Sequence, residues 1–146
     1  MKHRPATLAD CALLAELNQQ LIQDEGHRHP RTRRELEGRM RNWLLTEYRA
    51  VLFLKGRETV AYALFRLEPD EIYLRHLFVV RPRRRQGIGR EVMNLLRSKI
   101  WPADKRLTVE VLTRNPAGVA FWHAMGYQDY SLKLEIPPSP GASQFL

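Results

Sequence analysis

A run of apolar and β-branched side chains, EIYLRHLFVV at residues 71–80, leads directly into RPRRRQGIGREVM at residues 81–93. The first run has the composition of a buried strand, and apolar side chains after Gly89 return at helical spacing. A strand that ends in a basic, glycine-containing turn at the start of a helix favours a layered α/β fold. Three roles are open for the turn: it could hold a phosphate-bearing cofactor, bind a nucleic-acid backbone, or form a solvated bend.

The remaining sequence predicts helices and strands around this unit. Capping signals at Thr7 and Thr32 each precede apolar side chains at helical spacing, which predicts two helices before the first β-prone run. In the second of these helices, Arg39 is expected on the side that faces solvent. The predicted helices cover about residues 7–24, 32–44, 88–100 and 116–125, and the predicted strands after the first helices cover 50–54, 59–67, 71–80, 106–112 and 127–136.

Length and charge limit the possible architectures. The 146 residues suffice for one domain with its own core, predicted over residues 1–136 and followed by a tail at 137–146. No apolar run approaches the roughly 20 residues of a membrane-spanning helix, and nothing marks the N-terminus for secretion, so we expect a cytoplasmic protein. The formal net charge of +8 favours anionic partners without identifying them.

The chemistry of the turn favours a phosphate ligand. The start of a helix presents unpaired N–H groups and the positive end of its dipole, which attract phosphate. Gly87 and Gly89 lack the Cβ atoms that would keep an anion from these amides. A dinucleotide fingerprint would need glycine in place of Val92, and a phosphate-binding loop of the Walker type would need Gly-Lys-Ser/Thr, so neither of these motifs is present.

Two motifs resemble those of the GCN5-related N-acetyltransferase (GNAT) superfamily, whose members bind acetyl-coenzyme A. RRQGIG at residues 84–89 is similar to the superfamily signature Gln/Arg-x-x-Gly-x-Gly/Ala, and Asn115, Phe121-Trp122 and Gly126-Tyr127 are similar to its second motif. The resemblance implies the GNAT fold, an α/β fold with a mixed sheet of about six strands flanked by four helices in the order βααβββαβαβ. It also implies acetyl-CoA-dependent transfer of an acetyl group to a primary amine of a small molecule or peptide, by direct attack in a ternary complex.

The resemblance further implies where coenzyme A would bind. The pyrophosphate would lie on the amides of the basic turn, and the pantetheine arm would lie along the strand that precedes it, where a backbone amide polarises the thioester carbonyl. The implied cofactor-binding residues are Leu77, Phe78, Val79, Arg84, Arg85, Gln86, Gly87, Ile88, Gly89, Arg90, Asn115, Phe121 and Trp122. No metal is expected.

Two residues are candidates for the base that takes a proton from the amine. Glu110 stands five residues before Asn115, where related acetyltransferases of ribosomal-protein N-termini place a glutamate proposed as base. A solvent-facing strand glutamate paired with an arginine is the alternative. His76 interrupts an apolar strand just before the pantetheine segment, and its alternative role is an ordinary hydrogen-bonded histidine.

Other polar residues are candidates for binding the acceptor. Arg75 could fix an acidic group of the substrate, and Tyr73 would share its face of an unbulged strand. The loop between the first two helices, which holds Glu25 and His27, is either an ordinary exposed loop or part of substrate recognition, in which Glu25 would meet a cationic amine. Trp122 departs from the family pattern, which has a tyrosine there whose hydroxyl protonates the leaving sulfur, whereas indole cannot act as an acid. Tyr127, Tyr130 or water would supply the proton in its place, or the thiolate would leave unprotonated.

Three functions therefore remain in competition. The first is the acetyltransferase; the second is a non-catalytic acyl-CoA-binding module of the same fold in which Trp122 replaces the acid. The third is a basic nucleic-acid-binding protein, against which the sequence argues because it lacks a recognition helix with base-reading side chains. The oligomeric state is open, and a homodimer is possible because many members of the superfamily are dimers.

Overall fold

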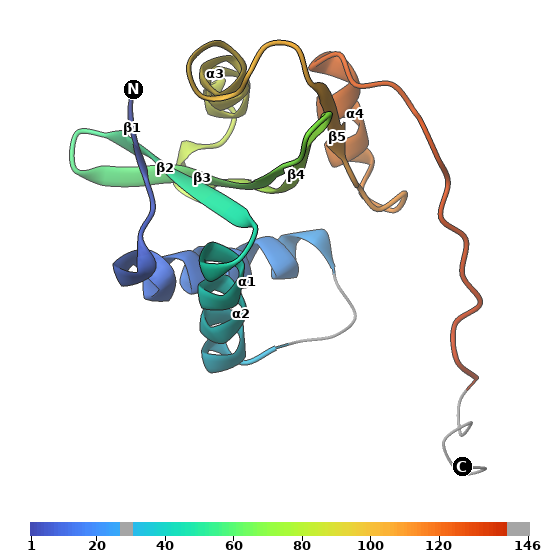
Figure 1. Cartoon of the computed structure of the whole chain (residues 1–146). Helices are drawn as coiled ribbons and strands as arrows, with labels where there is room; N and C mark the ends of the chain where they lie inside the picture. Colours follow the sequence, from blue (N-terminus) through green and yellow to red (C-terminus); the bar gives the residue numbers. More distant parts are fainter. Residues whose placement is uncertain (27–30, 140–146) are drawn as a thin grey trace.

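The protein is built on a single five-stranded sheet with the strand order β1-β2-β3-β4-β5 (Figure 1). The computed structural model describes residues 1–26 and 31–139. The first four strands are antiparallel to their neighbours, whereas β5 runs parallel to β4. The strands are β1 (Lys2–Pro5), β2 (Tyr48–Lys55), β3 (Glu58–Leu67), β4 (Glu71–Val79) and β5 (Arg106–Val109).

Helices cover both faces of the sheet (Figure 1). On one face lie α1 (Cys11–Glu25) and α2 (Arg33–Leu45), and on the other lie α3 (Ile88–Leu95) and α4 (Pro116–Ala124). Short 3-10 turns, η1 (Leu8–Asp10) and η2 (Arg81–Arg83), precede α1 and α3, and a π-helical turn, η3 (Leu96–Ile100), extends α3. The element order therefore matches the prediction up to α4.

Local signals in the sequence explain where the helices begin. The Thr32 hydroxyl accepts a hydrogen bond from the Glu35 amide at 3.1 Å, and the Glu35 carboxylate accepts one in return from the Thr32 amide at 3.2 Å. This capping box satisfies amides that have no partner within α2. At α4 the Asn115 carboxamide caps the Gly118 amide at 3.1 Å, directly before Pro116.

Each face of the sheet carries its own apolar core. One core packs α1 and α2 onto side chains such as Tyr62, Leu64 and Phe78. The other packs α3 and α4 onto side chains such as Phe65 and Leu74. Because both faces of the central strands are covered, β3 is buried almost without interruption from Val60 to Phe65.

Strand β4 has two irregularities that shape the site. Leu64 of β3 pairs with His76, and the next residue, Phe65, pairs with Leu74, so Arg75 is the extra residue of a β-bulge. On its other edge, β4 pairs with β5 only from Glu71 to Leu74. Within the described residues, the second half of β4 therefore has a strand partner on one edge only.

The C-terminal part of the sequence differs from its prediction. β5 ends at Val109, although a strand was expected to continue to residue 112, and no strand forms at 127–136. Residues 127–139 extend away from the sheet instead (Figure 1). A strand needs a partner for its backbone groups, and in this structure none of the described residues pairs with this segment. The sheet consequently has five strands where about six were expected.

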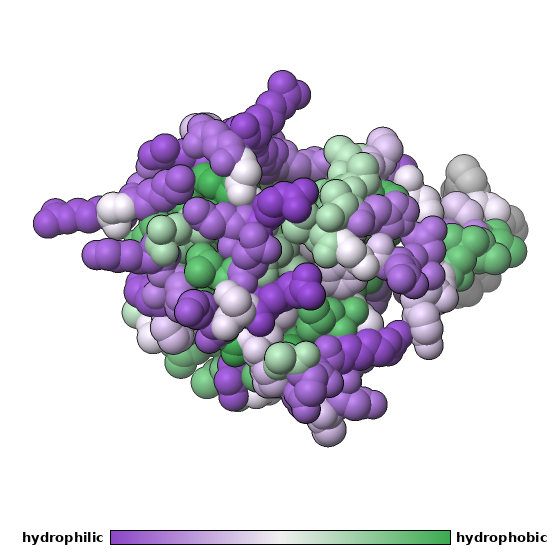
Figure 2. Space-filling model, turned by 90° about the horizontal axis from the view of Figure 1, so that it is seen from above, coloured by the Kyte–Doolittle hydropathy of each residue, from purple (hydrophilic) through white to green (hydrophobic). Residues whose placement is uncertain are grey.

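This C-terminal segment exposes an unusual amount of apolar surface. Tyr130, Leu132, Leu134 and Ile136 alternate with polar residues and are 83%, 68%, 81% and 97% exposed. Figure 2 shows apolar side chains at the edge of the molecule, beside the grey residues where this segment ends. Among the described helices, none is long and apolar enough to cross a bilayer.

Candidate functional site

The turn between β4 and α3 has the backbone geometry of an anion site. Arg85 and Gly87 both have positive φ angles, 62° and 76°, and α3 starts directly after them. The left-handed conformation at Gly87 explains why glycine is found there, because a Cβ would strain that backbone. The first amides of α3 have no carbonyl one turn earlier to bond, so they are available to a ligand.

Acidic residues already hold several of the arginines in this turn. Asp24, at the end of α1, accepts hydrogen bonds at 2.6 Å from both Arg81 and Arg84. Partial burial alone would raise the pKa of Asp24, but the two arginines outweigh it and lower the pKa. Arg84 also donates to the Val79 carbonyl at 2.9 Å, and Arg83 is paired with Glu58. The Arg84 side chain, expected at the cofactor, is therefore engaged in holding the turn against α1.

The second glycine of the motif has a packing role that the sequence did not predict. A Cβ at Gly89 would lie 3.0 Å from Cε1 of Phe121 and 4.0 Å from Cγ2 of Val79, so the missing side chain lets α3 approach α4 and the end of β4. A Cβ at Gly87, in contrast, would meet nothing within 4 Å. Gly87 thus serves the backbone conformation, and Gly89 serves the packing of Phe121, whose ring contacts Trp122.

The expected pantetheine segment lies on the open half of β4. Phe78 is buried toward α1 and α2, whereas Leu77 and Val79 are partly buried and pack with the α3 and α4 core. The edge of this segment away from β3 has no strand beside it within the described residues. An extended ligand could add to that edge as a further strand does, between the turn and α4.

The β-bulge gathers polar residues on the α1 and α2 face of β4. Successive side chains of a regular strand alternate between faces, yet Arg75 and His76 both contact Trp43. Tyr73 packs against the same core. Tyr73 and Arg75 thus share a face, as expected, although the strand is bulged and His76 joins them.

Glu110 lies just past the end of β5, beside the Tyr73 hydroxyl. Burial of Tyr73 and the neighbouring Glu110 carboxylate, which also acts as its hydrogen-bond acceptor, raise the pKa of Tyr73 to about 12. Tyr73 therefore stays protonated at neutral pH, and Glu110 remains exposed at the rim of this group of residues. Glu110 and Tyr73 come together because Leu74 pairs with Val109 across the parallel ladder.

His76 lies deeper on the same face. Its Nδ1 is 3.1 Å from the hydroxyl of Tyr62, and its ring meets Trp43 edge-on at 5.4 Å. Burial, with a smaller contribution from the charge of Glu25, raises the pKa of Tyr62 well above its ordinary value. The role of Glu25 in binding the acceptor stays a prediction, since only the effect of its charge on Tyr62 links it to this pair. His27 lies outside the described residues.

Neither tyrosine expected to replace the acid lies in this group. Tyr127 packs on Trp122 with ring centroids 5.4 Å apart, and burial raises its pKa to about 12, partly offset by Arg97. It therefore belongs to the α3 and α4 core rather than to the face that holds His76. Tyr130 lies over Arg106 at the start of β5, at the end of the strand opposite Glu110.

Three residues around the Trp43 ring were not expected in the site, namely Trp43 itself, Tyr48 and Arg39. The sequence predicts Trp43 on the apolar side of its helix and Arg39 on the solvent side, and Tyr48 falls just before the predicted strand at 50–54. The Arg39 guanidinium instead lies 4.7 Å from the centre of the Trp43 ring. The spacing of four residues between them is the signal that could have placed them together on a helix.

The described residues contain no group of three or more histidine, cysteine, aspartate or glutamate side chains able to hold a metal ion. A surface hollow of about 570 Å³ lies elsewhere, between η3 and the start of β5, and contains none of the motif residues.

Comparisons with known proteins agree with this fold. A family model described as "Acetyltransferase (GNAT) family" matches residues 13–127. A mutant of the BH1408 protein from Bacillus halodurans is 23% identical, with a TM-score of 0.78 over 95% of this chain and 100% of that one. A search of curated proteins found no match.

Two further structures with the same fold carry functional descriptions. An acetyltransferase from Thermus thermophilus is 22% identical, with a TM-score of 0.74 over 87% of this chain and 86% of that one. A protein described as a predicted acetyltransferase with acetyl-CoA, from Clostridium acetobutylicum, is 18% identical, with a TM-score of 0.73 over 93% and 95% of the two chains.

The two motif glycines should respond differently to alanine. Gly89→Ala is expected to lower the free energy of unfolding by about 1–3 kcal/mol, because its methyl group would overpack Phe121. Gly87→Ala is expected to cost about 1–2 kcal/mol through its left-handed backbone alone. Urea unfolding measures both.

Gly38→Ala is the matched control. Gly38 lies within α2 with nothing near its missing Cβ, so alanine there should stabilise the protein by up to about 1 kcal/mol. A Gly89→Ala protein as stable as wild type would contradict the packing role of Gly89.

Proposed function

The chain belongs to the acetyltransferase (GNAT) family, and we propose that it transfers an acetyl group from acetyl-CoA to a primary amine of a small molecule or peptide. Acetyl transfer with acetyl-CoA is the activity of the family; the amine acceptor and the residues are the proposal. The observation that carries it is the group of residues formed by Tyr73, His76 and Glu110, on the strand whose free edge leads to the amides of α3.

Acetyl-CoA supplies the activated acetyl thioester when bound. The open edge of β4 at Leu77, Phe78 and Val79 would hold its pantetheine arm, and the first amides of α3 would hold its pyrophosphate. Arg85 and Arg90 would add charge at the pyrophosphate, because within the described residues neither is bonded to a carboxylate. A free N–H group of β4 would stabilise the negative charge that develops on the thioester oxygen.

Glu110 and His76 would share the handling of the amine proton. An alkylamine with a pKa near 10.4 is mostly charged at pH 7, so it must lose a proton before its nitrogen can attack. His76 can accept that proton through Nε2 only in the tautomer whose Nδ1–H donates to the Tyr62 oxygen. Glu110 is exposed and needs no particular tautomer, which makes it the simpler base.

The chief alternative is a non-catalytic acyl-CoA-binding module, which Trp122 favours. Trp122 stands where the family pattern has its tyrosine, and it packs between Phe121 and Tyr127. An indole in that position cannot protonate a leaving sulfur. The group of Glu110, Tyr73 and His76 favours the enzyme, because a binding module has no need of a base.

The first prediction separates these functions. Isothermal titration should show micromolar binding of acetyl-CoA, and a thiol-release assay over a panel of primary amines should show amine-dependent turnover. Tight binding without amine-dependent release would favour the module. No binding at all would contradict both, and would leave the nucleic-acid alternative.

The second prediction concerns the base. Replacing the residue that takes the proton should lower kcat/KM at pH 7 by about 10²–10⁴-fold. The variant is Glu110→Gln if that residue is Glu110, and His76→Ala if it is His76. The loss should shrink toward pH 10, because an amine near its own pKa no longer needs a base. Glu37→Gln, which removes a carboxylate that faces Arg41 on α2, is the control. If both variants keep wild-type rates at pH 7, the two assignments are wrong.

The exposed C-terminal segment supports a homodimer. Its four alternating apolar side chains have the pattern of a half-buried strand, and β5 is an edge strand with free backbone groups. The same segment from a second copy, related by a twofold axis, could bury these apolar side chains and bond the free backbone groups of β5.

The third prediction tests this assembly. Wild-type protein should be dimeric by light scattering after size exclusion, and Leu134→Lys should shift it to monomer, since a charge would enter the apolar contact. Leu45→Lys, at a leucine that is 63% exposed on α2, should stay dimeric. A wild-type protein that is monomeric at every concentration would contradict the proposal.

A further inference from the structure

Two arginines converge on one aromatic ring on the proposed acceptor side of β4. The guanidinium carbons of Arg39, from α2, and Arg75, from the β4 bulge, each lie 4.7 Å from the centre of the Trp43 ring. Tyr48 completes the group: its ring centroid lies 5.6 Å from that of Trp43, and its hydroxyl accepts a hydrogen bond from Arg75 at 3.4 Å. Stacking on aromatic rings fixes the orientation of both guanidinium groups.

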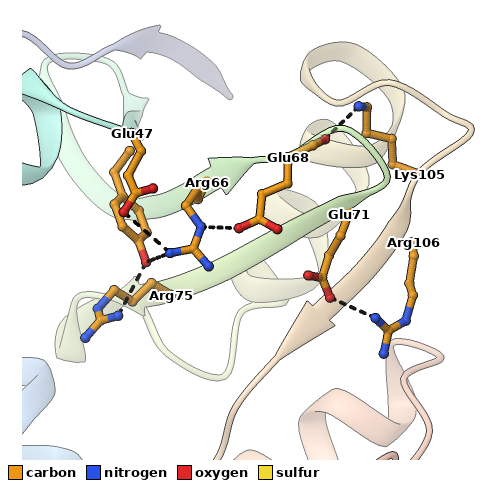
Figure 3. A network of polar contacts seen from close by, with 8 residues as sticks. Glu47, Arg66, Glu68, Glu71, Arg75, Lys105 and Arg106 are labelled. Atoms are coloured by element: carbon orange, nitrogen blue, oxygen red, sulfur yellow. Dashed lines mark hydrogen bonds and ion pairs between the residues drawn. The ribbon is translucent and has the colours of Figure 1, made fainter.

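Neither of these arginines is neutralised. Within residues 1–26 and 31–139, no ion pair joins Arg39 or Arg75 to a carboxylate. Arg66, on the neighbouring strand, is by contrast paired with Glu47 and Glu68 at 3.6 and 2.6 Å. Figure 3 shows dashed lines from Arg66 to Glu47 and Glu68, whereas the Arg75 guanidinium extends to the opposite side from Glu68.

The like charges at Trp43 act on one another. Burial, followed by the charges of Arg31 and Arg75, lowers the pKa of Arg39. An oxyanion between the two guanidinium groups would remove this repulsion and satisfy their free N–H donors. Arginine presents those donors as a planar fork that matches a carboxylate or a phosphate.

This group lies apart from the expected pyrophosphate site. Arg75 precedes Val79 by four residues, which is about 13 Å along a strand, and the turn amides begin only after Val79. Arg75 is instead adjacent to His76 and shares its face. An anion bound at Trp43 would therefore belong to the molecule that receives the acetyl group.

We propose that Arg39 and Arg75 bind an oxyanion of the acceptor, so that the substrate is an amine that also carries a carboxylate or a phosphate. This inference rests on the proposed function. Glu25 and Glu110 would face the amine of such a molecule while the arginines face its acid group. The bulge would thus set the distance between the amine and the acid group, because it brings His76 to the face that Arg75 occupies.

Pairs of amines that differ only in the acid group test this proposal. The standard amino acids are compared with their carboxamides, and phosphoethanolamine with ethanolamine, by thiol release from acetyl-CoA. Wild-type protein should prefer the acid of at least one pair by 10-fold or more in kcat/KM. Arg75→Gln and Arg39→Gln should each bring that ratio toward one, while the affinity for acetyl-CoA stays unchanged.

Arg41→Gln is the matched control, because it removes the same charge from another face of α2 and should keep the wild-type ratio. A preference only within the phosphoethanolamine pair would assign the oxyanion to phosphate. Equal use of acid and neutral amines, or a preference that survives both substitutions, would overturn the proposal.

The proposed function and this inference can fail separately. If no amine releases thiol, the transferase proposal fails. The same pairs are then compared by NMR binding to the coenzyme A complex, with wild-type and Arg75→Gln protein. Selective binding of an acid that Arg75→Gln loses would still support the oxyanion site, and equal binding of both members of every pair would overturn it.

Discussion

The arrangement of the site depends on how β4 pairs with its two neighbours. One edge is bonded to β3 through nearly its whole length, whereas the other is bonded to β5 only as far as Leu74. Beyond the end of β5, backbone groups of β4 become available to a ligand, while β4 stays in the sheet through its bonds to β3. The bulge at Arg75 lies at this same point, and a one-residue insertion shifts which face every later side chain occupies. His76 and Phe78 therefore face α1 and α2, and Leu77 and Val79 face α3 and α4.

Charge is distributed around this strand in two different ways. At the turn before α3, Asp24 and Glu58 bind arginines and fix the loop against α1 and β3. Beside the bulge, Arg39 and Arg75 are held by the Trp43 ring instead, and no carboxylate among the described residues pairs with either of them. The first arrangement stabilises the backbone whose amides we propose to bind the pyrophosphate, and the second leaves the side chains themselves for the oxyanion proposed above. A net charge of +8 gave no means to tell these arrangements apart.

The features that the sequence predicted correctly are local ones. Three such features act over only a few residues: the capping box at Thr32, the proline after Asn115 and the Gly-x-Gly turn. The helix starts that they form can therefore be predicted from adjacent residues in the sequence. The bulge could not be predicted, because it depends on the register against β3. The contact of Gly89 with Phe121 joins residues far apart in the sequence and appears only once α3 and α4 are placed. The alternating pattern at 127–136 predicts a strand, but alternation alone does not provide a partner.

Trp122 leaves the fate of one proton to be explained in the proposed reaction. Forming the C–N bond releases a proton from the amine nitrogen, and breaking the C–S bond leaves a thiolate that can take one up. Tyr127 is confined to the α3 and α4 core with a pKa of about 12, and Tyr73 is held by Glu110 with a similar pKa. A thiol pKa near 8.5 makes the thiolate a tolerable leaving group without a tyrosine acid. A charged amine loses two protons in all: Glu110 or His76 would pass the first to solvent before the attack, and the second, released when the C–N bond forms, would reach the sulfur through water. One base would then suffice, without the tyrosine of the family pattern.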